Sequence, residues 1–295
     1  MMPSNARHMR SGPSTLALVT ALFIIWMPLQ ASAQESEAWF ELGTHAQNPP
    51  VGAAVLALSP LASGYLYLTD LVYVEIIAGG VGTVNLTDDD VDLESRGDVD
   101  VRFGNPYLGV GFFTEGSGRQ IDITTGLTVP LASTEGAASY AFAEGMRGGA
   151  DPWLWAPRRL APVVGGSIRQ RMQGGFILGG ELQMAAMSWF GDGEQDAIYV
   201  LQTGIVASTS LSEDFDIGTR AQGVVGRSLG NQGQRGFQTA AEIFAELEVG
   251  DQTYHARLTV PINNPYGFGF SSDGVWGLHI GMGISFDRFR GIVED

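Results

Sequence analysis

The sequence contains no cysteine. This absence excludes disulfide-bonded scaffolds, zinc sites built on thiolates, cysteine nucleophiles and a lipid-modified N-terminal cysteine. Lysine is absent as well: all 16 basic residues are arginine, and 32 acidic residues leave a formal net charge of -16. Binding to nucleic-acid phosphates needs clustered positive charge, so this acidic composition argues against a nucleic-acid partner.

Charged residues are scarce, at 16% of the chain, compared with roughly 25% in typical soluble domains. Hydrophobic residues nevertheless make up 44%, and glycine is abundant at 41 residues. A disordered chain is excluded because the apolar content is too high. Collagen is excluded because the glycines follow no Gly-X-Y period.

Long hydrophobic runs are missing beyond the N-terminus, so no transmembrane helix is expected in the rest of the chain. The N-terminus itself has the three parts of a secretory signal peptide. Arg7 and Arg10 form a positive segment, residues 15–27 are apolar, and Ala31-Ser32-Ala33 provides a cleavage site of small residues.

An uncleaved membrane anchor is the alternative interpretation of this N-terminus. Pro28 and the small residues that follow it favour cleavage instead. We therefore predict a signal peptide at residues 1–33 and one exported domain at residues 34–295.

Apolar and polar residues alternate along nearly all of that domain, as in β-strands whose two faces meet different surroundings. In residues 276–287 the even positions are apolar, from Trp276 to Phe286, while the odd positions are small or polar. Gly104-Asn105-Pro106 interrupts the fourth of twelve such segments. The segments lie at about residues 38–44, 51–60, 65–79, 98–113, 120–131, 160–172, 176–189, 197–209, 214–228, 237–249, 253–262 and 275–288.

The connections between these segments alternate in length. The short connections lie at residues 61–64, 114–119, 173–175, 210–213 and 250–252, and the intervening ones are mostly longer. A soluble sandwich has no reason to sort its loops in this way. Outer-membrane barrels combine short periplasmic turns, longer external loops and an even number of strands.

Two further features favour a membrane barrel over a secreted sandwich or a lipocalin-like barrel. Several segments begin or end in an aromatic residue, as interfacial girdles require. The polar face carries glycine, serine, threonine, glutamine and isolated charges, which suits an enclosed lumen better than a soluble surface. We predict an all-β fold, a transmembrane antiparallel up-and-down β-barrel of about 12 strands.

The mature chain resembles Gram-negative outer-membrane β-barrel proteins. Its last segment, residues 275–289, is similar to the terminal strand that such proteins present for assembly, except that residues 290–295 follow the final aromatic. Residues 103–109 (FGNPYLG) and 147–155 (RGGADPWLW) resemble uncharacterised transporter-like barrels of deltaproteobacterial type, distantly similar to the putative phenol-degradation pathway transporters. The resemblance implies a barrel and names no substrate.

The charged residues on the polar face are the candidates for lining the lumen. They are Arg169, Arg171, Glu181, Arg220, Glu242, Glu246, His255, Arg257 and His279. A two-residue turn at Gly250-Asp251 would place Glu246 opposite His255, with Arg257 diagonal to Glu246. We expect a cluster of these three side chains near the periplasmic mouth, acting either in ion selectivity or as a brace of the wall.

The longest loop, residues 133–155, contains the one stretch that fits a helix. Ala137, Ala138, Ala141, Phe142, Gly145 and Met146 could form its apolar face. An external cap on the barrel is the favoured interpretation. A constriction folded into the lumen and a membrane-surface anchor through Trp153 and Trp155 are the alternatives.

Enzymatic activity is not expected. Barrel hydrolases carry a His-x-Ser pair, and none of His45, His255 and His279 has a serine two residues away. The acidic loop at residues 88–94 departs from the EF-hand pattern and is expected to be solvated. No cofactor or metal is therefore predicted.

The most favoured function is passive or facilitated passage of small solutes through the outer membrane. The alternative is a structural or surface-interaction barrel with a closed lumen, because a barrel of this size can be filled by side chains and a loop. The expected partners are outer-membrane lipid and lipopolysaccharide, the barrel-assembly machinery and a small-molecule solute.

Overall fold

The computed structural model describes residues 36–47, 55–85, 99–193, 195–228, 236–263, 265 and 269–286. The predicted signal peptide lies outside these residues, as does the acidic loop at residues 88–94. Among the described residues, no helix is both long enough and apolar enough to cross a membrane.

The described residues form thirteen strands and a few short helical segments. The strands are β1 (Ser36–Gln47), β2 (Val55–Tyr67), β3 (Val72–Asn85), β4 (Val99–Phe103), β5 (Tyr107–Gly116), β6 (Arg119–Thr128), β7 (Arg159–Arg171), β8 (Phe176–Trp189), β9 (Ile198–Ser210), β10 (Phe215–Ser228), β11 (Gly236–Val249), β12 (Gln252–Pro261) and β13 (Gly277–Phe286). The helical segments are η1 (Thr134–Gly136), α2 (Ala137–Met146), η2 (Pro152–Leu154) and α3 (Phe270–Asp273).

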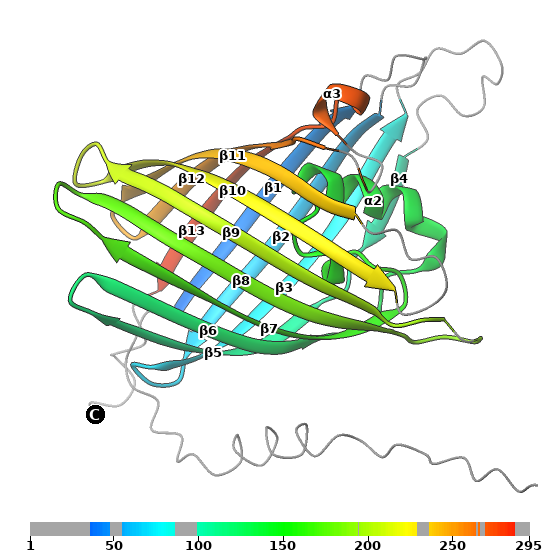
Figure 1. Cartoon of the computed structure of the whole chain (residues 1–295), viewed down its shortest axis with the longest axis horizontal. Coiled ribbons are helices and arrows are strands. Elements are labelled where there is room, and N and C mark those ends of the chain that lie inside the picture. The colour runs from blue at the N-terminus through cyan, green and yellow to red at the C-terminus, as the bar shows by residue number, and fades with distance from the viewer. Residues whose placement is uncertain are drawn as a thin grey trace, which may run out of the picture. The chain divides into compact units, whose positions relative to one another are not determined.

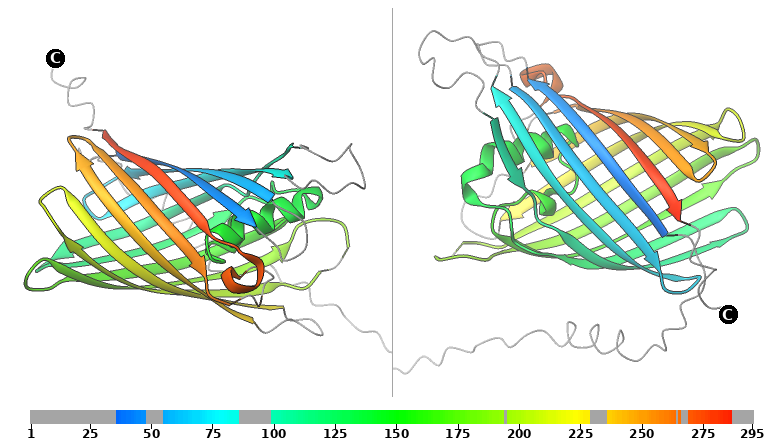
Figure 2. Two further views of the ribbon diagram at one scale, coloured as in Figure 1. Left: turned by 90° about the horizontal axis from the view of Figure 1, so that it is seen from above. Right: turned by 180° about the vertical axis from the view of Figure 1, so that it is seen from behind.

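The strands form an antiparallel up-and-down barrel (Figures 1 and 2). Apart from β4 and β5, which do not pair with each other, each strand pairs with its neighbours in the sequence, and β1 pairs with both β2 and β13, which closes the ring. Both β4 and β5 pair with β3, so they occupy one position that is interrupted at residues 104–106. The ring therefore has twelve positions, in agreement with the predicted strand number.

The first short turn lies later in the chain than expected. Residues 61–64 belong to the interior of β2, and the turn between β2 and β3 lies at residues 68–71. Pro60 makes the sequence look broken here because it has no N–H to donate across the sheet. The structure keeps the strand continuous: the hydroxyl of Ser59 donates to the carbonyl oxygen of Gly80, which lies opposite Pro60.

Glycine gives the tight turns the backbone angles that they need. Ser117 and Gly118 both have positive φ in the turn between β5 and β6, and Gly250 has φ 62° between β11 and β12. The turn at Gly250-Asp251 pairs Val249 with Gln252 and Glu246 with His255, which is the register expected from the sequence.

The outer face of the barrel is apolar. In β13, Ile280 is 60% exposed whereas His279 and Gly281 are buried, so adjacent residues point to opposite faces. Exposed aromatic side chains lie near both ends of the strands. Phe112, Phe176 and Tyr254 lie near the end with the short turns, and Phe190, Tyr199 and Phe237 lie near the other end. This is the arrangement of a membrane-spanning band between two interfacial girdles.

Candidate functional site

The connection between β6 and β7, residues 129–158, folds inside the ring, and we call it the plug. Its helix α2 contacts β1, β2, β3, β4, β12 and β13, and Figures 1 and 2 show it enclosed by these strands. Tyr140, Met146 and Trp153 of the plug are each at most 3% exposed. The expectation of an external cap is therefore wrong, and the constriction folded into the lumen is the arrangement observed.

Apolar packing explains this position. Tyr140, Ala143, Met146, Trp153, Leu154 and Trp155 form one hydrophobic cluster with inward side chains of the wall such as Leu61, Val81, Met187 and Val224. The helix face differs from the predicted one, since Ala141 is exposed and Tyr140 is buried. An isolated helix of this length is marginal in water, so burial of this cluster supplies most of its stability.

Asn105, in the break between β4 and β5, anchors the plug from one side. Its side-chain nitrogen donates to the carbonyl oxygens of Trp153 (3.0 Å) and Ala156 (2.7 Å). Its side-chain oxygen accepts from the backbone N–H of Ala132 (2.8 Å), and its own N–H donates to Leu154 O (2.7 Å). One buried amide thus holds both ends of the plug.

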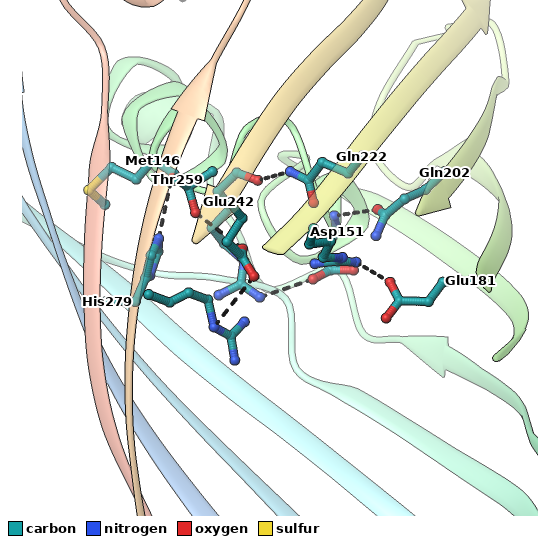
Figure 3. A network of polar contacts seen from close by, with 11 residues as sticks. Met146, Asp151, Glu181, Gln202, Gln222, Glu242, Thr259 and His279 are labelled. Carbon is teal, nitrogen blue, oxygen red and sulfur yellow. Dashed lines mark hydrogen bonds and ion pairs between the residues drawn. The ribbon is translucent and has the colours of Figure 1, made fainter. Parts of the chain in front are cut away.

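Three polar side chains hold the plug from the opposite wall (Figure 3). Gln222 of β10 donates to Arg147 O at 2.6 Å, and His279 of β13 donates through Nε2 to Met146 O at 3.1 Å. Gln202 of β9 accepts from the backbone N–H of Asp151 at 2.9 Å. The last carbonyl groups of a helix have no partner within it, so here the barrel wall satisfies them.

The close approach of plug and wall requires glycine at Gly148. Its φ is +67°, and a Cβ there would collide with Ala240 and the side chain of Gln222. Any other residue would be strained both by the backbone angle and by the lack of space.

Beside the plug, the lumen contains a cavity of about 360 Å³. Trp153, Leu154, Arg147 and Asp151 of the plug contribute to its lining, and the rest comes from inward side chains of the wall. The wall has two chemically different parts. Strands β7 to β12 contribute most of the charged groups, and β2, β3 and β5 contribute tyrosines and apolar side chains.

The charged groups of the cavity form ion pairs (Figure 3). Arg220 lies 2.5 Å from Glu181, and Arg147 lies 3.1 Å from Asp151 within the plug. Arg257 forms a longer pair with Glu242 at 3.9 Å. The register places Glu246 opposite His255, but the ion pair described for Arg257 is with Glu242 rather than with Glu246. The carboxylate of Glu242 also accepts a hydrogen bond from Thr259, which lies opposite it. The cluster around Glu246 therefore stays a prediction.

The tyrosine wall depends on glycines beneath the rings. The ring of Tyr73 lies over Gly111, and its hydroxyl reaches across to donate to Asp122 of β6 at 2.7 Å. The ring of Tyr107 lies over Gly109 and Gly126 in the same way. Without a Cβ at these positions, aromatic rings can lie flat against the sheet.

The predicted site residues fall into three groups. Arg169, Glu181, Arg220, Glu242, Glu246 and Arg257 line the cavity. His255 and His279 are buried in the wall, at 4% and 3% exposure. Arg171 is exposed at the short-turn end of β7.

Several residues of the site were not identified from the sequence. Glu75 and Asp122 line the cavity, and Asn105, Gln202 and Gln222 hold the plug. Asp122 and Gln202 could have been found from the alternation alone, because both lie on the polar face of their strands. The role of Asn105 depends on the plug, which no local pattern reveals.

Glu144 is the one acidic residue of helix α2. Burial raises its pKa from an ordinary 4.5 to about 7. Burial thus favours the protonated form of this carboxyl group. Across the described residues, no group of three or more histidine, aspartate or glutamate side chains could hold a metal ion.

Comparisons with known proteins identify the fold. No protein-family model matches the chain, and no curated protein sequence matches it. Among solved structures, the COG4313 outer membrane channel from Pseudomonas putida F1 is similar over 88% of this chain and 98% of its own, with 12% identity and a TM-score of 0.56. The KdgM porin (8% identity, 84% and 99% covered, TM-score 0.45) and the NanC porin (8%, 84% and 100%, 0.48) also match. The chain thus has the fold of an outer-membrane β-barrel.

Proposed function

We propose that this protein is an outer-membrane channel for passive or facilitated passage of small solutes. The observation that carries the proposal is the lumen cavity of about 360 Å³, lined by charged and polar side chains beside the plug. A barrel stabilised only by packing has no need of buried ion pairs, which cost desolvation energy. Channels use such charges to select their solutes.

The proposal also includes the outer-membrane location of the protein and its partners there. The apolar outer band contacts outer-membrane lipid, and the longer external loops contact lipopolysaccharide. The signal peptide at residues 1–33 is removed on export, and the barrel-assembly machinery inserts the domain of residues 34–295. The proposal includes no enzymatic step and no cofactor.

A closed barrel with a structural or surface-interaction role is the second candidate. The plug supports it, because its side chains belong to a continuous hydrophobic cluster and its backbone is bonded to several strands. Under this alternative the plug stays docked and no solute passes.

Planar-bilayer recording on the refolded mature chain distinguishes the two. Because the chain has no cysteine, Thr83→Cys with Ser139→Cys would form the sole disulfide. The two side-chain oxygens lie 3.0 Å apart between β3 and α2. We expect stepwise conductance in the wild type, and a lower conductance in the oxidised double variant that reduction restores. Each single-cysteine variant is the control.

Absence of conductance in the wild type and in the reduced double variant would support the closed barrel. Equal conductance before and after reduction would mean that solutes pass the plug without moving it.

A further inference from the structure

The charges of the lumen cavity are not balanced. Arg147, Arg220 and Arg257 each have a carboxylate partner within the cavity lining. Glu75 of β3 is different: among the described residues no ion pair joins it to an arginine. Its carboxyl group has a hydrogen bond with the side chain of Tyr65, and the charges that act on it are those of Asp122 and Asp151. A carboxylate that is only 8% exposed therefore lies in a negative environment.

Tyrosines surround this carboxylate. Tyr65 lies directly opposite Glu75 on β2, and Gly109 lies opposite it on β5, beneath the ring of Tyr107. Tyr73 precedes Glu75 by two residues on the same face of β3, and its ring meets that of Tyr65 edge to face with centroids 5.6 Å apart. All four side chains line the cavity.

This combination has a specific chemistry. The faces of aromatic rings are negative, so they attract a cation, and the attraction is strongest where water is excluded. The carboxyl group of Glu75, when ionised, adds a negative charge at the same place. The arginines that line the cavity lie on β7, β10, β12 and the plug, and the ion pairs of Arg147, Arg220 and Arg257 are with other carboxylates.

We propose that Glu75, Tyr65, Tyr73 and Tyr107 form a subsite for the ammonium group of a small organic cation. This inference deepens the proposed function, on which it rests, by naming the class of solute. Trp153 and Leu154 of the plug offer apolar surface within the same cavity for the remainder of the solute. The cavity volume is at the lower end of the range for small-molecule sites, about 300–1,000 Å³.

An anion is the competing ligand because Arg169 also lines the cavity. Its charge acts on Asp122, which Tyr73 holds by a hydrogen bond. Arg169 thus lies near an acidic side chain, whereas no ion pair with an arginine is formed by Glu75 in the part of the chain that the structure describes. The charges around Glu75 therefore favour a cation over an anion at this subsite.

Equilibrium binding to the refolded full-length mature chain tests the proposal without requiring an open pore. Isothermal titration calorimetry in octyl glucoside, a detergent without an ammonium group, would compare choline with 3,3-dimethylbutan-1-ol, its uncharged isostere, and with benzoate. We expect choline to bind saturably at least about tenfold more tightly than the other two.

Matched variants assign the site. Glu75→Gln should weaken choline binding at least about tenfold, whereas Glu246→Gln, which removes the same charge from the opposite wall of the cavity, should change it less than about twofold. Tyr65→Leu should weaken binding more than Tyr65→Phe, which keeps the ring and loses only the hydrogen bond to Glu75. These two variants keep the test valid if Glu75→Gln does not refold. Heat-modifiable migration on a gel verifies folding of each protein.

Equal binding of choline and its uncharged isostere would overturn the proposal, as would preferential binding of benzoate or equal losses in Glu75→Gln and Glu246→Gln. Conductance without choline binding would support the channel function and contradict the proposed ammonium subsite. Choline binding without conductance would contradict passage while keeping the subsite.

Discussion

At the scale of single residues, the alternation places neighbours in the chain in opposite environments. Ile280 is exposed on the outer face, while His279 on one side of it bonds to the plug and Gly281 on the other is buried. The cost of a substitution therefore depends on which face it changes. The same polar residue is costly toward lipid and mild toward the lumen.

Ile280→Arg tests this assignment. Because the side chain would have to enter lipid, we expect a loss of about 2–4 kcal/mol if the position lies near the bilayer midplane. Gly281 is adjacent to Ile280 and faces the lumen, so Gly281→Ser should change the free energy of unfolding only slightly. Urea unfolding of both proteins in lipid vesicles measures the difference, and an Ile280→Arg variant as stable as the wild type would show that the faces are assigned wrongly.

Asn105 provides a second residue-scale prediction. Asn105→Ala removes the donor to two plug carbonyls and the acceptor from Ala132, and each buried group left unpaired costs about 1–3 kcal/mol. We expect faster tryptic cleavage of the plug at Arg147 and Arg158 while the barrel stays folded.

The matched control is Asn263→Ala. This amide also makes several hydrogen bonds, but they join it to Phe237 and Thr239 of the wall. Its removal should leave plug cleavage unchanged. Equal cleavage in the wild type and both variants would mean that Asn105 does not hold the plug.

At the scale of elements, the plug shows how a short apolar helix is stabilised. Helix α2 has no acidic residue in its first turn and no basic residue in its last, so favourable charge–dipole contacts do not stabilise it. Wall side chains bond to its terminal carbonyls instead, and its apolar residues join the cluster inside the ring. The helix and the barrel wall thus depend on each other.

The plug should respond to pH through Glu144. Burial raises the pKa of this carboxyl group to about 7 when the plug is docked, whereas an undocked plug would restore the ordinary 4.5. Docking then takes up a proton, so it is favoured as the pH falls from 7 toward 4.5 and weakened as the pH rises through 7. We expect tryptic cleavage of the plug to be faster at pH 8 than at pH 6, beyond the change in trypsin activity.

Glu144→Gln should abolish this difference, because the amide does not titrate. Glu135→Gln removes an acid of the same loop whose side chain is 81% exposed, and it should keep the wild-type response. A pH response that survives Glu144→Gln would assign it to another group. Rates are normalised with an unfolded tryptic substrate at each pH.

At the scale of the whole molecule, ring closure and the outer band suit a protein that is surrounded by lipid. Among the described residues every strand except β4, which pairs only with β3, is paired on both sides, so the ring leaves little free edge. The polar cavity and the hydrophobic cluster both lie inside, and the outer face is left to apolar side chains. A soluble protein would expose this apolar band to water, which favours aggregation.

We therefore expect the mature protein to begin at Gln34 and to fractionate with the outer membrane. It should be released from this membrane only when detergent is added. N-terminal sequencing of the extracted protein tests the cleavage site, and density-gradient separation of membranes tests the location. Recovery of the protein in the soluble periplasmic fraction without detergent would contradict the membrane assignment.

Much of the fold could be predicted from the sequence because its signals are local. Alternation with a period of two marks a strand wherever its faces differ, and the glycine at Gly250 marks a turn whose length sets the register of Glu246 with His255. The second predicted segment ends at residue 60, whereas β2 continues to Tyr67. Whether a strand continues past a proline depends on contacts with other strands, here the hydrogen bond from the Ser59 hydroxyl to Gly80.

The sequence by itself thus determined the strands, their faces and the approximate number of positions in the ring. Only the tertiary structure decided what fills that ring. The plug turns inward because its apolar side chains meet those of strands distant in the chain, and Glu75 gains its tyrosine surroundings from β2, β3 and β5 together. Such contacts depend on which strands become neighbours across the barrel, and a pattern with a period of two residues carries no information about distances through the lumen.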